Sequence, residues 1–190
     1  MKVDVQNRIR ESIDVKSKIM NNDALCVKIY NSAELIYNSL RNSKKLILCG
    51  NGGSASDALH FAGEMVGRFQ KERKAWPAIV LNADVATLTA ISNDYGYDNV
   101  FERQAEAYTR EGDIFLGIST SGNSKNVYQA MKKAKSLGAT TIGLLGKDGG
   151  CISKISDCSI VIPSNVTARV QESHIMIIHI ICEIIEEMFV

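Results

Sequence analysis

The stretch that decides the fold is residues 46–67, which read Leu-Ile-Leu-Cys-Gly-Asn-Gly-Gly-Ser-Ala-Ser-Asp-Ala-Leu-His-Phe-Ala-Gly-Glu-Met-Val-Gly. The apolar run at its start is typical of a strand that is buried on both faces. A glycine-rich turn follows, and then a helix is predicted over residues 54–67. His60 and Glu64 are four residues apart on this helix, so they lie on one face. A buried strand, a polar turn and a helix with two ionisable side chains are thus predicted in succession.

The rest of the chain continues this alternation of strands and helices. Strands are predicted at 45–49, 78–82, 113–118, 140–145 and 158–162, and helices at 54–67, 84–92, 98–110, 124–137 and 168–189. The pattern predicts an α/β fold, a doubly wound parallel five-stranded sheet with helices on both sides. In such sheets ligands bind at the carboxyl ends of the strands. Function is therefore expected on the loops after residues 49, 82, 118 and 145.

Two amphipathic helices are predicted before the first strand, at residues 3–20 and from 23 to about 40. Their apolar faces either cover the sheet or pack on another subunit, and the two alternatives are compatible. The chain is expected to be a single domain over residues 1–190. Within it, residues 1–42 hold the helix pair, which is expected to form an oligomer, and residues 45–190 hold the α/β core.

Composition excludes several classes of protein. The formal net charge is +1, which gives no support for a nucleic-acid surface. The longest apolar stretch, residues 175–182, is too short to span a bilayer, and the first six residues lack the hydrophobic core of a signal peptide. The five cysteines lack CxxC spacing. They are expected to be reduced packing residues of a cytoplasmic protein.

Residues 50–54, the glycine turn, match the start of a dinucleotide fingerprint, Gly50-x-Gly52-x-x-Ala55. The match is weak, because no acidic residue ends the next strand about 20 residues on, where ribose binding would need it. A nicotinamide or flavin cofactor is therefore disfavoured.

Residues 119–124, the serine loop, read Ser-Thr-Ser-Gly-Asn-Ser and open the helix predicted at 124–137. Backbone N–H groups, hydroxyl donors and the positive end of the helix dipole all favour an anion there. A simple helix cap needs one hydroxyl rather than four. No Gly-Lys-[Ser/Thr] follows, so the loop is not a nucleotide P-loop. It predicts binding of a phosphorylated metabolite such as a sugar phosphate.

His60 and Glu64 suit a shared metal ion, a proton-transfer pair or a plain hydrogen bond. His179 lies in the middle of the apolar last helix, where a buried histidine needs a partner. With Gln171, these residues could hold a divalent ion such as zinc. Gln171 and His179 are separated by about 12 Å of helix rise, so both reach one ion only if it lies between them. His174 is expected to support a ligand from behind or to lie at the surface.

Together these residues resemble the phosphoheptose isomerases (sedoheptulose 7-phosphate isomerases), a family of the sugar isomerase (SIS) superfamily. The matching motifs are Cys49-Gly50-Asn51-Gly52-Gly53-Ser54, His60-Phe61-Ala62-x-Glu64, Asn93-Asp94-Tyr95-Gly96, Gly112-Asp113, Gly117-Ile118-Ser119-Thr120-Ser121-Gly122-Asn123-Ser124, Gly146-Lys147-Asp148-Gly149-Gly150 and Arg169-Val170-Gln171-Glu172-x-His174 with His179. The resemblance covers nearly the whole chain. Departures are few: Val170 replaces a more usual isoleucine, and Ala168 stands where some members carry an aspartate.

The resemblance implies conversion of sedoheptulose 7-phosphate to D-glycero-D-manno-heptose 7-phosphate by a cytoplasmic homotetramer. The product feeds activated heptose for surface polysaccharide, either lipopolysaccharide or capsule. The implied zinc ligands are His60, Glu64, Gln171 and His179. The implied substrate contacts are Asn51, Gly52, Gly53, Ser54, Asn93, Asp94, Ser119, Thr120, Ser121, Ser124 and Gln171.

As a catalytic hypothesis, Glu64 takes the carbon-bound proton and His179 is the acid, while a bound zinc ion polarises the carbonyl. The serine loop grips the phosphate, and Asp94 positions hydroxyls. Glu64 could be base, ligand or both. The alternative is a non-catalytic tetrameric SIS protein that binds the replication initiator. Those relatives lack the glutamate and the final histidine, so the presence of Glu64 and His179 favours the enzyme.

Overall fold

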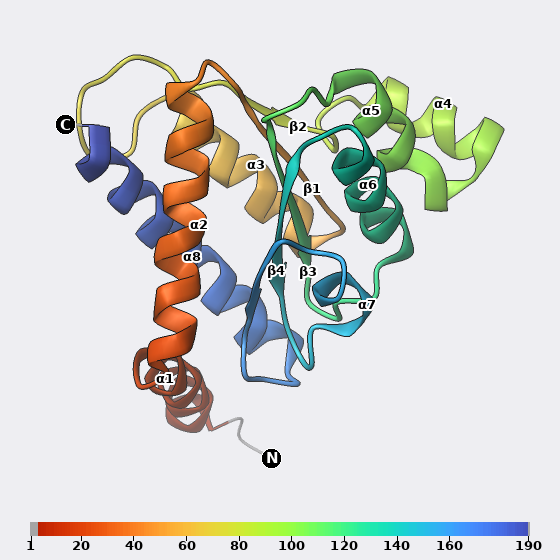
Figure 1. Ribbon diagram of the computed structural model, residues 1–190. Helices are drawn as coiled ribbons and strands as arrows, with labels where there is room; N and C mark the ends of the chain where they lie inside the picture. The colour runs from red at the N-terminus through yellow and green to blue at the C-terminus, as the bar shows by residue number, and fades with distance from the viewer. Residues whose placement is uncertain (1–3, 190) are drawn as a thin grey trace.

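The structure, a computed structural model, describes residues 4–189 (Figure 1). Five parallel strands form one sheet in the order β2-β1-β3-β4-β5, which confirms the predicted fold class. The strands are β1 Leu46–Gly50, β2 Ala78–Val80, β3 Ile114–Ser119, β4 Thr140–Leu145 and β5 Cys158–Val161. β2 ends two residues before the prediction. The Asn82 side chain there bonds the main chain of Gly50 through both its oxygen (3.1 Å) and its nitrogen (2.6 Å).

The helices are α1 Val5–Met20, α2 Asp23–Arg41, α3 Gly53–Val66, α4 Val85–Tyr95, α5 Val100–Tyr108, α6 Lys125–Ser136, α7 Gly150–Ser153 and α8 Thr167–Phe189. Residue 3, where the first predicted helix starts, lies outside the described residues. The predicted helix 98–110 is divided into a short 3-10 helix, η1 Tyr97–Asn99, and α5. α7 was not predicted, because four residues are too few to show a helical period.

The sheet is covered on both faces, as its apolar runs predict. Alternate residues of a strand point to opposite faces. Leu46 packs with α2, α3 and α8 on one face, and Ile47 packs with α5 and α6 on the other. Figure 1 shows these two helical layers on either side of the sheet. β1 is buried along its whole length, so it has no solvent-facing side.

The two N-terminal helices differ in how they are covered. α2 buries Ile29 and Ile36 against the core, which confirms the interpretation that it covers the sheet. α1 instead exposes a row of apolar side chains: Val5, Ile9 and Ile13 are 64%, 56% and 55% exposed. No side chain within residues 4–189 covers this row.

None of the helices within residues 4–189 combines the length and apolarity that crossing a membrane requires. All five cysteines lie in the described part and are free thiols. Cys49 and Cys182 are buried in the core, which agrees with a packing role for these two. Burial raises the pKa of Cys182 to about 12, so this thiol is unreactive at neutral pH.

Candidate active site

Helices α3 and α8 pack together and bring His60, Glu64 and His179 into one cluster. His60 Nε2 lies 3.1 Å from Glu64 Oε1 and 3.0 Å from His179 Nε2. The side chains of His60 and Glu64 are 45% and 24% exposed, so a small molecule can reach them. Three of the four residues predicted to surround a metal ion are therefore adjacent, although more than a hundred residues separate the two helices in sequence.

The donor atoms of this cluster fit a divalent cation. One ligand atom from each of the three residues lies within 4.8 Å of the others. Two imidazole nitrogens and a carboxylate oxygen are a ligand set that zinc commonly has in catalytic sites. The facing Nε2 atoms can share only one proton, or both can bind a metal as neutral imidazoles. The cluster therefore fits a metal ion as well as a proton-transfer pair.

Gln171 contacts α3 at the start of the helix, away from His60 and Glu64. A Cβ atom added at Gly53 would lie only 2.2 Å from Gln171 Nε2, so the amide rests directly on the first residue of α3. His60 lies seven residues further along, about 10 Å of helix rise. The structure thus joins Gln171 to the glycine turn, and its place among the metal ligands stays a prediction.

His174 is not at the surface, and that part of the sequence interpretation is wrong. The side chain is fully buried, with Nε2 3.1 Å from the main-chain oxygen of Leu145, while Nδ1 is buried without a partner. Burial lowers the pKa of His174 to about 4, and the hydrogen bond to Leu145 opposes this only in part. His174 is therefore a neutral core residue that ties α8 to the end of β4.

The depressed pKa of His174 predicts acid sensitivity of the fold. The unfolded chain takes up a proton near pH 6.5, but folded His174 does so only near pH 4. The unfolded state thus binds more protons between these values, and stability falls as pH drops from 6.5 to 4. We expect the stability advantage of wild type over His174→Gln to shrink by about 2 kcal/mol from pH 7 to pH 5. Urea unfolding of both proteins at the two pH values measures this, and a constant difference would contradict it.

The glycine turn is held by residues that the sequence did not single out. Asn51 and Asn126 form a reciprocal amide pair, with Nδ2–Oδ1 distances of 2.9 and 3.0 Å. The Tyr97 hydroxyl also donates to Asn51 Oδ1, at 2.8 Å. These bonds fix the Asn51 side chain within the protein. Asn126 lies two residues after the serine loop, but nothing in the linear pattern pairs it with Asn51.

The serine loop gathers hydroxyl groups at the start of α6. Ser119 Oγ lies 2.9 Å from Ser124 Oγ and 3.4 Å from Ser121 Oγ, and Ser121 Oγ accepts the N–H of Asn123 (3.1 Å). Ser124 is the N-cap residue of α6, yet its own side chain makes no capping hydrogen bond to that helix. The hydroxyls are therefore grouped around one another where the helix dipole favours an anion.

Two further residues predicted to contact the substrate, Asn93 and Asp94, are on α4. Asn93 and Asp94 are exposed at the end of α4, and Asn93 Nδ2 donates to Asp94 Oδ1 at 2.9 Å. Among the described residues they bond to each other rather than to the serine loop. The Tyr97–Asn51 hydrogen bond ties the segment after them to the glycine turn.

Asp57 is a partly buried carboxyl group near His60 that the sequence pattern did not single out. It is on α3, three residues before His60, and its Oδ2 is buried without a partner. Burial raises the pKa of Asp57 to about 6, against the opposing effect of His60. The three-residue spacing from His60 could have indicated it.

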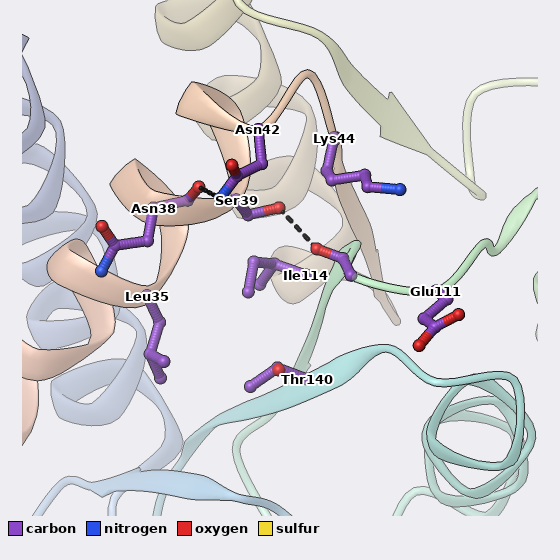
Figure 2. A pocket seen from close by; sticks show the side chains of 9 residues that line it. Leu35, Asn38, Ser39, Asn42, Lys44, Glu111, Ile114 and Thr140 are labelled. Atoms are coloured by element: carbon purple, nitrogen blue, oxygen red, sulfur yellow. Dashed lines mark hydrogen bonds between the residues drawn. The ribbon is translucent and has the colours of Figure 1, made fainter.

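A separate pocket of about 450 Å³ lies at the opposite edge of the sheet (Figure 2). It is bounded by the end of α2 and by the first residues of β3 and β4. Two polar side chains in its wall are already paired: Ser39 Oγ donates to the Gly112 carbonyl (2.9 Å), and Asn42 Nδ2 donates to the Asn38 carbonyl (2.8 Å). The edge of the sheet at the carboxyl ends of the strands is therefore the better candidate for the active site.

Two solved structures are similar over nearly the whole chain. A phosphoheptose isomerase from Neisseria gonorrhoeae has a TM-score of 0.90 at 42% identity, covering 96% of this chain and 97% of that one. One from Francisella tularensis has a TM-score of 0.92 at 36% identity, covering 96% of each chain. A family model described as the SIS domain matches residues 9–146. Fold, site and family model together define an SIS-domain protein.

Sequence relatives narrow this class. A phosphoheptose isomerase from Clostridium acetobutylicum is 49% identical over 98% of this chain and 95% of its own. One from Sulfurimonas denitrificans is 51% identical over 98% and 96%. The chain belongs to the phosphoheptose isomerase family and is an aldose–ketose isomerase.

Proposed function

We propose that the enzyme converts sedoheptulose 7-phosphate into D-glycero-D-manno-heptose 7-phosphate, with the reaction centred on His60, Glu64 and His179. The observation that carries the proposal is the contact between these three side chains on two neighbouring helices, within reach of solvent. An aldose–ketose isomerase must move a proton between C1 and C2 and adjust the protons on two oxygens. A carboxylate and an imidazole in contact provide groups for both tasks.

In the proposed mechanism Glu64 removes the proton from C1 of the ketose. The electron pair forms the C1–C2 double bond, and the carbonyl oxygen on C2 takes a proton from His179, which gives the ene-diol. Glu64 then returns its proton to C2 while the C1 hydroxyl loses a proton to His179, which gives the aldose. The contact with His60 orients the Glu64 carboxylate. Zinc held by His60, Glu64, His179 and Gln171 would, when bound, polarise the substrate carbonyl.

The serine loop would hold the phosphate of the substrate, and the glycine turn with Asn93, Asp94 and Gln171 would contact the sugar. Binding energy from a remote phosphate orients the reacting carbons. The grouped hydroxyls of Ser119, Ser121 and Ser124 support this role, since they lie at the start of α6 and the N-cap side chain, Ser124, makes no capping hydrogen bond.

The phosphate assignment predicts a binding defect in Ser124→Ala. A hydrogen bond to a charged group is worth about 1.5–3 kcal/mol, so kcat/KM should fall roughly 10- to 100-fold, mainly through KM. Ser136→Ala is a matched control, because Ser136 caps the other end of α6 through the Lys133 carbonyl (2.7 Å). Steady-state kinetics measure both variants, and an unchanged KM in Ser124→Ala would remove Ser124 from the phosphate site.

We also propose that the enzyme is a homotetramer of the cytoplasm. The exposed apolar row on α1 supports assembly, as does a groove of about 600 Å³ between α1, α2 and α8. Ile9→Glu, which places a charge in this row, should give a smaller particle in analytical ultracentrifugation. Val85→Glu on α4, where Val85 is 68% exposed, is the control and should keep the wild-type mass. An unchanged mass for Ile9→Glu would place the interface elsewhere.

The product is proposed to enter activated-heptose synthesis for lipopolysaccharide or capsule. The relatives named above are isomerases, and so favour the enzyme over a non-catalytic initiator-binding protein. The test of the proposed function is incubation of the purified protein, supplied with zinc, with sedoheptulose 7-phosphate. An aldoheptose phosphate should accumulate to an equilibrium ratio. No conversion with zinc present would overturn the substrate assignment.

A further inference from the structure

The segment between α3 and β2, residues 67–77, is tied to α8 by one buried carboxylate. Glu186 has a side chain only 2% exposed. It accepts the backbone N–H groups of Phe69, Gln70 and Lys71 at 3.0, 2.9 and 2.9 Å. Three successive main-chain donors converge on one side chain, so the start of the segment is fixed relative to α8.

Arg73 extends this contact to the end of α3. Its Nε donates to Glu186 Oε1 at 3.0 Å, and the guanidinium lies over the Trp76 ring at 3.4 Å. Nη2 donates to the main-chain oxygen of Glu64 at 2.7 Å, and Nη1 to that of Met65 at 3.0 Å. The last carbonyls of a helix lack intrahelical partners. Arg73 therefore caps α3 at the very residue that carries the proposed base.

The same segment also touches the proposed acid. The Phe69 and His179 rings lie 5.6 Å apart between centroids, at 31° to each other. His179 and Glu186 are seven residues apart on α8, which places them on nearly the same side of that helix. The segment thus lies along this side of α8, with Phe69 against His179 and its N–H groups on Glu186.

We propose that Arg73, Glu186 and Phe69 form a positioning clamp that holds α3 and α8 at the spacing required for proton transfer. Arg73 fixes the backbone at Glu64, Phe69 fixes the ring of His179, and Glu186 joins the two. The proposal rests on the proposed roles of Glu64 and His179. In this proposal the three clamp residues act through the residues that they hold.

The chemistry of the pair favours positioning over plain stabilisation. A buried ion pair is often no more stabilising than apolar residues of similar volume, because both charges lose water. Burial alone would raise the pKa of Glu186, but the N–H groups of Gln70, Lys71 and Phe69 and the Arg73 guanidinium hold this pKa below its ordinary value. The carboxylate therefore stays charged and directional, which suits a fixed geometry.

The test compares Phe69→Leu and Arg73→Lys with wild type in the full-length enzyme supplied with zinc. Phe69→Leu removes the ring but keeps an apolar side chain, and Arg73→Lys keeps the charge but cannot reproduce the forked contacts. Gln70→Ala is the matched control, because exposed Gln70 contributes only its backbone N–H. Kinetics, thermal unfolding and the activity of Glu64→Gln are measured together.

The clamp predicts that kcat falls about 10- to 100-fold in both variants, because misplacement of about 1 Å costs on that order. KM should stay within about 2-fold of the wild-type value. Each variant should melt above the assay temperature, so that it is folded during the assay. Unchanged kcat, or a loss of kcat that only follows the folded fraction, would overturn the clamp. If Glu64→Gln is inactive in that case, the proposed function survives and the clamp alone fails. If Glu64→Gln is active, the catalytic assignment beneath the clamp fails.

Discussion

Replacing Glu64 with glutamine is expected to lower kcat by roughly 1,000-fold while leaving the enzyme folded. Loss of a general base typically costs about 10²- to 10⁴-fold. Glutamine has nearly the same shape as glutamate, and Arg73 bonds the main-chain oxygen of residue 64, which the substitution leaves in place. Glutamine can also still accept a hydrogen bond from His60. KM should change little, because the missing interaction acts in the transition state.

Glu72→Gln is the matched control for this experiment. Glu72 is also the second member of a pair spaced by four residues, with Arg68 at 3.6 Å, but its side chain is 89% exposed. The control should have wild-type kinetics. Zinc content of Glu64→Gln separates the two roles of the carboxylate: retained zinc with lost turnover identifies a base, and lost zinc identifies a ligand. Near-normal turnover of Glu64→Gln would contradict the assignments of Glu64 as the base and as a zinc ligand.

Gly122→Ala is expected to have the second-largest effect, because it distorts the serine loop itself. Gly122 has φ +66°, and an added Cβ would lie 2.1 Å from the Gly149 carbonyl oxygen. Backbone atoms obstruct the methyl group here, so relief requires the serine loop to separate from residues 146–150. Left-handed backbone costs an alanine about 1–2 kcal/mol, and with the clash we expect roughly 2–4 kcal/mol of lost stability. The melting temperature should fall by roughly 5–15 °C, and KM should rise.

Gly63→Ala provides the contrast. Gly63 lies within α3, and a Cβ there would meet nothing within 4 Å. Alanine in a helix is about 0.5–1 kcal/mol better than glycine, so this variant should be at least as stable as wild type. Differential scanning calorimetry compares the two variants. If Gly122→Ala has the same melting temperature as Gly63→Ala, the close packing of the serine loop against residues 146–150 is contradicted.

The parallel sheet could be predicted because its cause is local. A strand covered on both faces must be apolar throughout, and residues 46–49 and 114–118 show this directly. The end of α6 also has a local cause, because Gly138 follows it and glycine readily takes the φ of +84° found there. The contact between α3 and α8 was predictable because His179, which lies in the apolar run of α8, needs a polar partner, and His60 and Glu64 on α3 could provide one.

Other features depend on contacts that no local pattern contains. Asn51 pairs with Asn126, and Glu186 gathers three N–H groups from residues 69–71, more than a hundred positions away. The sequence predicts His174 either behind a ligand or at the surface, but its side chain lies in the core and contacts the main-chain oxygen of Leu145 at the end of β4. Such pairings arise only when tertiary packing brings distant segments together.

In the proposed mechanism Glu64 carries a proton between C1 and C2 of the substrate. It is tested most directly by running the reaction in deuterium oxide and following deuterium at C2 of the aldose by NMR. An acid–base pair open to solvent exchanges the carried proton, so wild type should place deuterium at C2, whereas Glu64→Gln should bind the substrate without labelling it. If Glu64→Gln incorporates as much deuterium at C2 as wild type does, the assignment of Glu64 as the base is contradicted.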